Sequence, residues 1–470
     1  MFRRPLAGRW VLLWLFCLMA GSLAAAADMV YVDSICVQGN ERTKTAVILR
    51  ELDFRPGDSL PMSDLQPCLE RNRRYLMNTG LFSEVLLNVR DWQVPDNRLV
   101  ISVRVQEAWY LYFIPLFELA DRNFNLWWRD YEHDFRRINA GFILHHANVT
   151  GRRDRLKISA QLGFTRKLDL DYALPFFDTA QRWGLGFRLF LSDSQYLRYN
   201  TVDNKEVFRY DPSERLLHRF QLVGRLQRRP ALHSLQRLEL GFFRTRIAAE
   251  VAEDLNPDFL GEGRRLQRYF LLRYTFEWDD RDVRPYPRRG MYLSFSLEKR
   301  GLGVFKELKA AYGEMLLKHY LPLWRRAGLE SVFRSRIAIQ RGPQPYYNSR
   351  ALGYGKDFLR GYEYYLLDGL DMAFAKWSLR LPLWNRVWNW GKAMPVAGLR
   401  KMPLRLYFCV NGDLGYVHNP WYGAGNSLSD SWLWSTGVGL DIVSYYDKVF
   451  QIQLSGNRLG EIGLFLHWDF

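Results

Sequence analysis

The stretch DRLKISAQLGF, residues 154–164, alternates between polar and apolar side chains from its second residue onward. The apolar positions are Leu156, Ile158, Ala160, Leu162 and Phe164, and the polar positions between them are Arg155, Lys157, Ser159 and Gln161. A period of two residues is typical of a β-strand, because successive side chains point to opposite faces. The pattern returns in residues 167–176, 182–191, 237–243, 290–298, 404–410, 450–456 and 461–470. Residues 108–470 are therefore predicted to form an antiparallel β-structure.

Two features favour a membrane barrel over a soluble sheet for this part of the chain. The face opposite the apolar side chains often carries charged residues or Gln, as a water-filled lumen requires. Aromatic residues also gather near the predicted strand ends, as at Trp109-Tyr110, Trp127-Trp128 and 384–390, which is typical of interfacial girdles. At roughly 23 residues per strand with its connection, the length permits about sixteen strands, and about fourteen or eighteen would also fit.

The N-terminus predicts export from the cytoplasm. Arg3, Arg4 and Arg9 precede the apolar run VLLWLFCLMA, and small residues in GSLAAAADM follow. This is the three-part layout of a secretory signal peptide over residues 1–27, with cleavage after Ala26 or Ala27. No later segment has the roughly twenty consecutive apolar residues of a membrane helix.

Charge is distributed unevenly along the chain. Residues 30–107 hold ten Lys/Arg and eleven Asp/Glu, whereas residues 108–470 hold 53 and 38. In an exported protein, this excess predicts contact with anionic lipid headgroups or lipopolysaccharide, and we do not expect a nucleic-acid partner. Three cysteines remain after cleavage, an odd number that argues against a disulfide framework.

The pattern of residues 29–107 predicts a small α/β domain with the element order β-α-α-β-β. Strands are predicted at 30–40, 82–90 and 98–107, and helices at 43–52 and from Ser63 to Gly80, with Ser63 as N-cap. This segment resembles a POTRA domain, the periplasmic module of BamA-type outer-membrane transporters. The matching residues are Gly39, Asn40 and Thr43, then Glu51-Leu52 and Pro56-Gly57-Asp58, and finally Asn78-Thr79-Gly80-Leu81-Phe82-Ser83-Glu84-Val85.

The second part also resembles the BamA/TamA-type superfamily, in which such a barrel follows one or more POTRA domains. One motif is a turn that runs through Asp280, Arg281 and Asp282 to Pro287 and Gly290. Since carboxylates flank Arg281, local ion pairs can fix the turn. We interpret this motif as a structural hairpin.

The stretch GYGKDFLRGYEYYLLDG, residues 353–369, carries the Arg-Gly-Tyr triplet Arg360, Gly361 and Tyr362. The resemblance implies that the loop over residues 342–370 folds back into the lumen. A buried guanidinium needs an acceptor, and Asp413 of the family pattern Asp-x-Gly is expected to face the lumen from its strand. Two residues depart from the family pattern: Asn411 replaces a Phe, and Ser378 replaces a carboxylate that could have been a second partner for the loop.

The resemblance implies an outer-membrane protein that inserts client proteins into this membrane or translocates them across it, with a periplasmic POTRA domain that engages unfolded clients. Periplasmic accessory proteins are possible partners. The single POTRA domain favours an accessory or specialised member of the superfamily. A dedicated translocator of one secreted partner and a passive porin are the alternatives. The sequence contains no Gly-x-Ser-x-Gly, His-Glu-x-x-His or phosphate loop, so we expect no enzyme, no cofactor and no metal.

The last strand ends in Trp468 and Phe470, which resembles the signal by which outer-membrane barrels are recognised for their own assembly. Deletion of Phe470 is expected to lower the amount of assembled barrel, because the strand end loses an apolar anchor, while export across the inner membrane stays normal. Immunoblots of fractionated membranes measure both quantities. Equal outer-membrane levels of the deletion variant and the parent would contradict the assignment.

Overall fold

The computed structural model describes residues 28–119, 127–128, 132–133, 135, 138–284, 286–324, 327–394, 400–444 and 448–469. The predicted signal peptide and Phe470 lie outside these residues. Contacts divide the chain into two units, with the main boundary between Gln106 and Glu107. No helix in the described ranges is both long enough and apolar enough to cross a membrane.

The small unit is a four-stranded sheet with two helices. Its elements are β1 (Met29–Gln38), α2 (Thr45–Arg50), β2 (Ser59–Pro61), η1 (Met62–Asp64), α3 (Leu65–Met77), β3 (Phe82–Gln93), η2 (Val94–Asp96) and β4 (Arg98–Glu107). The strand order is β2-β1-β4-β3, and β1 runs parallel to β4. Two details differ from the prediction. The breaker after the first helix leads into the short strand β2, and Ser63 lies in η1 without capping α3, which begins at Leu65.

The residues of the POTRA motif hold the sheet and the second helix together. Gly39 has φ +85°, and a Cβ there would lie 2.0 Å from the carbonyl oxygen of Val105, so only glycine fits. Gly80, with φ +72°, follows the end of α3, and Asn40 follows Gly39 in the loop before α2. Leu81 and Phe82 are buried in the core.

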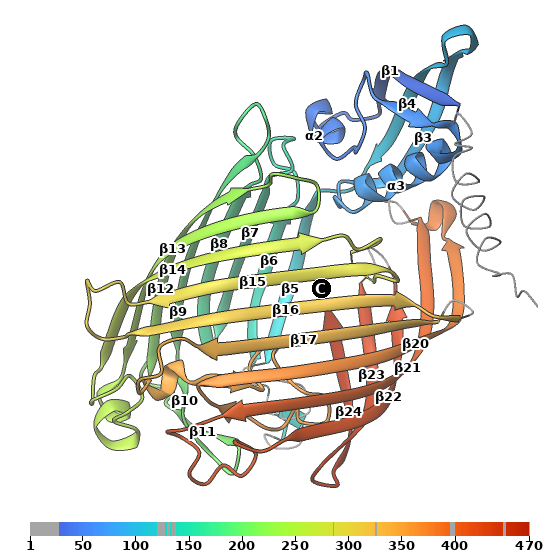
Figure 1. The fold of residues 1–470 in the computed structure, drawn as a ribbon. Helices are drawn as coiled ribbons and strands as arrows, with labels where there is room; N and C mark the ends of the chain where they lie inside the picture. Colours follow the sequence, from blue (N-terminus) through green and yellow to red (C-terminus); the bar gives the residue numbers. More distant parts are fainter. Residues whose placement is uncertain are drawn as a thin grey trace, which may run out of the picture. The chain divides into compact units, whose positions relative to one another are not determined.

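The large unit is a single antiparallel sheet of sixteen strands, which confirms the predicted architecture (Figure 1). Its strands are β5 (Leu111–Leu119), β6 (Ile138–His146), β7 (Arg155–Gly163), β8 (Thr165–Leu174), β9 (Trp183–Ser194), β12 (Leu217–Arg228), β13 (Ser234–Ile247), β14 (Leu266–Asp279), β15 (Gly290–Arg300), β16 (Ala310–Pro322), β17 (Gly328–Ala338), β20 (Asp371–Asn389), β21 (Lys401–His418), β22 (Leu433–Val443), β23 (Val449–Asn457) and β24 (Ile462–Asp469). We call the end at which β5 begins the entry end and the opposite end the far end.

Shorter elements lie in the connections. They are β10 (Tyr196–Val202), β11 (Lys205–Tyr210), η4 (Val251–Leu255), η6 (Tyr346–Asn348), β18 (Arg350–Leu352), β19 (Leu367–Asp368) and η7 (Gly391–Ala393). β10 pairs with β11, and β18 pairs with β19. Since successive strands of the barrel run in opposite directions, η7 lies at the entry end and the other six elements lie at the far end.

The two faces of the sheet differ as the alternating sequence predicts. On one face, which we call the inner face, Ser378 pairs with Asn411 and both are buried. On the outer face, large apolar side chains are exposed, including Leu162, Phe187, Leu222, Leu240, Leu272, Phe295, Val438 and Leu454. A polar interior and an apolar exterior are the pattern of a transmembrane β-barrel.

The cysteines of the small unit lie on opposite sides of its sheet, as the alternation around Cys36 predicts. Cys36 pairs with Ser102, on the face away from the buried Ile101 and Val103, whereas Cys68 on α3 is buried. Cys36, Cys68 and Cys409 are all free thiols. Burial raises the pKa of Cys68 to about 11, and the neighbouring carboxylate of Asp53 adds to this effect.

We expect alkylation at pH 8 to modify Cys36 much faster than Cys68 in the folded protein. With a pKa of about 11, only about one Cys68 thiol in a thousand is the reactive thiolate at this pH, and the side chain is also covered. Peptide mass spectrometry after timed treatment with iodoacetamide measures both rates, and urea-unfolded protein serves as the control in which the rates converge. Equal rates in the folded state would overturn the expectation.

Candidate functional site

The connection between β17 and β20 packs against the inner face of the barrel instead of projecting from it. Leu359, Tyr362 and Leu366 are buried. This segment, residues 342–370, forms one apolar cluster with strand residues that include Phe374 and Val417. Within the connection lie η6 and the β18–β19 pair.

The structure brings Arg360 and Asp413 together. The Nε of Arg360 donates to both carboxylate oxygens of Asp413 at 2.9 and 3.0 Å, and its Nη2 contacts the same carboxylate. The backbone N–H of Arg360 also donates to Asp413 at 2.9 Å. Both residues are buried, with exposed fractions of 7% and 4%. This is the paired, hydrogen-bonded state that a buried guanidinium and carboxylate require.

Ser378 is a further partner of Arg360, contrary to the inference that its substitution for a carboxylate removed a second contact. Its hydroxyl accepts from Nη1 of Arg360 at 2.8 Å, and the carbonyl of Trp377 accepts from Nη2 at 3.0 Å. A second carboxylate would have added negative charge beside Asp413. The neutral hydroxyl instead satisfies the remaining guanidinium nitrogen without changing the charge balance of the pair.

The residues that follow Arg360 extend the contact to the next strands. Gly361 has φ +80°, and its carbonyl accepts from Nδ2 of Asn457 at 2.7 Å. The hydroxyl of Tyr362 donates to the carbonyl of Trp434 at 3.1 Å. Gly415 of the Asp-x-Gly pattern leaves room for Leu359, since a Cβ there would lie 2.7 Å from Cδ1 of Leu359.

The loop also reaches the last strand, which the sequence did not indicate. Glu363 lies 3.4 Å from Nε2 of His467 on β24, and the ring of Phe358 stacks on the same histidine with centroids 5.0 Å apart. The hydroxyl of Tyr365 donates to Glu461 at 2.8 Å. Long-range partners of this kind carry no local sequence signal. The side chain of Trp468 and the whole of Phe470 lie outside the described part of the chain.

At the far end, the loop is joined to two other connections. The backbone N–H of Leu366 donates to the carbonyl of Asn204, between β10 and β11, at 2.7 Å. The N–H of Asn204 in turn donates to the side chain of Asn426 at 2.8 Å. Thr201 bonds Asp368 at 2.6 Å. Three segments that are distant in sequence therefore interlock where the loop enters the barrel.

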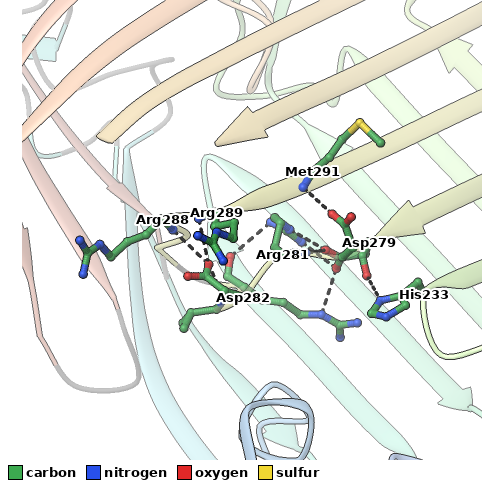
Figure 2. A network of polar contacts seen from close by, with 10 residues as sticks. His233, Asp279, Arg281, Asp282, Arg288, Arg289 and Met291 are labelled. Atoms are coloured by element: carbon green, nitrogen blue, oxygen red, sulfur yellow. Dashed lines mark hydrogen bonds and ion pairs between the residues drawn. The ribbon is translucent and has the colours of Figure 1, made fainter. Parts of the chain in front are cut away.

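The Asp-Arg-Asp motif forms the turn between β14 and β15 at the entry end (Figure 2). Arg281 forms two hydrogen bonds with the carboxylate of Asp279, at 2.7 and 2.9 Å, which confirms the predicted local ion pair in this turn. Asp280 and Asp282 instead accept backbone N–H groups, from Met291 and from residues 283, 288 and 289. Short acidic side chains next to a turn often accept its backbone N–H groups, so Asp280 and Asp282 stabilise the turn together with the ion pair.

The turn also reaches across to the strands that hold the loop. Gly290 has φ +103°, and a Cβ there would lie 2.7 Å from the carbonyl oxygen of Asp280. The hydroxyl of Tyr286 donates a hydrogen bond to Asp441 on β22 at 2.9 Å. The guanidinium carbon of Arg380 lies over the ring of Tyr286, 4.1 Å from the centre of that ring. The turn therefore connects β14 to β15 and also contacts the inner face of β20 and β22.

The fold and this arrangement define a class: an outer-membrane β-barrel with an anchored inner loop, preceded by a periplasmic α/β domain. Residues 30–108 match the POTRA family, described as a surface antigen variable number repeat, and residues 148–373 match the Omp85 superfamily domain. The protein is a POTRA domain joined to an Omp85 superfamily barrel. Omp85 barrels sit in the outer membrane with the POTRA domain in the periplasm.

Solved structures share the fold of this chain. BamA from Haemophilus ducreyi lacking POTRA domains 1–3 aligns with a TM-score of 0.51 at 15% identity, covering 93% of this chain and 83% of that chain. CdiB from Escherichia coli aligns with a TM-score of 0.55 at 11% identity, covering 93% and 75%. No curated protein matches the chain. The superfamily acts in protein assembly or translocation and is non-enzymatic.

We predict that Arg360→Ala and Asp413→Ala each destabilise the barrel by about 3–5 kcal/mol, because each strands one buried charge. The double variant should lose less than the sum of the two single losses, since it strands neither. Urea unfolding of the refolded barrel in lipid vesicles, followed by tryptophan fluorescence, gives the three free energies. Arg246→Ala, at an exposed position, is the control and should stay within about 0.5 kcal/mol of the parent. Strictly additive losses would show that the two side chains are not energetically coupled.

Proposed function

We propose that this protein is an accessory or specialised assembly factor that helps β-barrel clients enter the outer membrane, with the POTRA domain as the first contact for unfolded clients. The observation that carries the proposal is the anchored loop over residues 342–370. Its buried contacts to β20–β24 occupy the inner face of these strands, which supports client handling over the steady conduction of a porin. An extended segment of the client would instead form main-chain hydrogen bonds with an edge strand of this protein.

The POTRA sheet supplies an edge on which such pairing could begin. In the order β2-β1-β4-β3, one edge strand is β2, with three residues, and the other is β3, with twelve. A long edge strand carries unpaired backbone groups that can add an extended segment by main-chain hydrogen bonds. Leu86 on β3 is exposed and provides an apolar contact beside these groups.

The driving force for such an activity would come from the client itself. No nucleotide is available outside the cytoplasm, so client folding and the burial of apolar strand faces in lipid must supply the free energy. A single POTRA domain offers less surface for accessory proteins than an array does. This supports a specialised role rather than that of the central assembly factor.

The fold likeness to CdiB keeps a dedicated translocator as the second candidate. The two functions differ in the number of clients. An assembly factor meets several different barrels, whereas a dedicated translocator meets one exported partner.

Photo-crosslinking in living cells separates these candidates. A benzoylphenylalanine at Leu86 on the β3 edge is expected to capture several unfolded outer-membrane barrels, identified by mass spectrometry. The control places the same probe at Tyr31, which is equally exposed but lies on the interior strand β1, and should capture few clients. Capture of one secreted protein would favour the translocator. No client capture, together with a large steady conductance in planar bilayers, would favour the porin and reject the proposal.

A further inference from the structure

A second polar site lies on the inner face of the barrel, apart from the Arg360–Asp413 contact. It is a cavity of about 390 Å³ between the wall formed by β8, β9, β12–β15 and β17 and the loop residues Tyr347, Asn348 and Arg350. Neither Arg360 nor Asp413 lines it. A volume of this size lies in the range of small-molecule sites in proteins.

The charge of this cavity is strongly positive. The basic residues that line it are Arg188, Arg225, Arg273, Arg300, Arg336 and Arg350, and the acidic ones are Asp171 and Glu239. Protein carboxylates compensate part of this charge. Arg188 bonds Asp169 at 2.8 Å, Arg225 bonds Asp171, and Arg273 and Arg300 share Glu298.

Arg336 and Arg350 are not compensated in this way. Within the described ranges of the chain, neither has a carboxylate within 4.0 Å. Arg336 donates from Nη2 to the carbonyl of Gly369 at 3.3 Å, and the guanidinium of Arg350 lies over the ring of Tyr347, 4.6 Å from its centre. The Nε atoms of both arginines are buried and have no hydrogen-bond partner in the structure.

The surroundings of the two arginines differ. Glu314 and Asp357 act on Arg336 from a distance, against the like charge of Arg300. Arg198 and Arg219 add positive charge near Arg350, and the side chains of Tyr347 and Tyr354 act in the opposite direction. A buried cation without a counter-charge is costly, so the Arg350 side of the cavity has the stronger need for an anion.

We propose that the cavity binds a small phosphate-bearing anion between Arg350 on the loop and Arg336 on β17. Guanidinium groups present paired N–H donors that match phosphate oxygens, and these two groups line the cavity from the loop and from the wall. A dianionic phosphate group would supply hydrogen-bond acceptors and charge that the protein itself does not. Because Arg350 belongs to the loop and Arg336 to β17, the bound anion would hold residues 342–370 against β17, in addition to the contacts of the loop with β20–β24.

The test is calorimetric titration of the purified full-length protein in detergent with inorganic phosphate, at constant ionic strength with chloride as background. We expect saturable binding of one phosphate per chain. Arg350→Gln and Arg336→Gln should each raise the dissociation constant for phosphate at least tenfold. Arg246→Gln removes an exposed arginine that does not line the cavity and should bind like the parent.

Glucose 1-phosphate serves as a second ligand and distinguishes the possible sources of the phosphate group. Tighter binding of the sugar phosphate identifies an organic phosphate, and equal or weaker binding identifies the free ion. If either cavity variant fails to fold, Arg350→Lys, which keeps the charge but loses the paired donors, takes its place and should bind more weakly than the parent. Absence of saturable binding to the parent protein, or equal weakening in Arg246→Gln, would overturn the proposal.

Discussion

The buried ion pair between Arg360 and Asp413 is the interaction on which the interior of this barrel depends. Two opposite charges inside a barrel are tolerable only when nearly every donor and acceptor is satisfied. Here the carboxylate takes three donors of one residue, and Ser378 and the carbonyl of Trp377 take the others. Because leaving the site would strand both charges, the loop is held at a single register against β20 and β21.

This register determines what the rest of the loop can contact. With Arg360 in place, Gly361 and Tyr362 reach β22 and β23, and Glu363 comes beside His467 on the last strand. At the entry end, Tyr286 of the β14–β15 turn reaches β22 through Asp441. The C-terminal strands are thus held from the inside at two levels by segments that precede them in the chain. Strand pairing alone would not give this support.

Arginines recur on the inner face of the barrel. Several of them meet a carboxylate on a neighbouring strand, as Arg188 meets Asp169 and Arg380 meets Glu330. These pairs form across adjacent strands, where opposite charges are close enough to interact. Arg198, Arg219, Arg336 and Arg350 have no carboxylate within 4.0 Å among the described residues and contact hydroxyl, carbonyl or aromatic groups instead. The interior therefore holds both compensated and uncompensated arginines.

The sequence by itself determined the two-part organisation, the antiparallel strands and the inner placement of Asp413, because period-two alternation and turn residues are local signals. The structure selected sixteen strands from the numbers that the length permits. It also singled out Arg360 and Gly39. Only the tertiary structure decided that Ser378 accepts a hydrogen bond from Arg360, and that Asn457 and His467 contact the loop. Each of these contacts depends on strand register or on a loop path across the barrel. Such geometry arises from the simultaneous packing of segments up to a hundred residues apart, which no local pattern encodes.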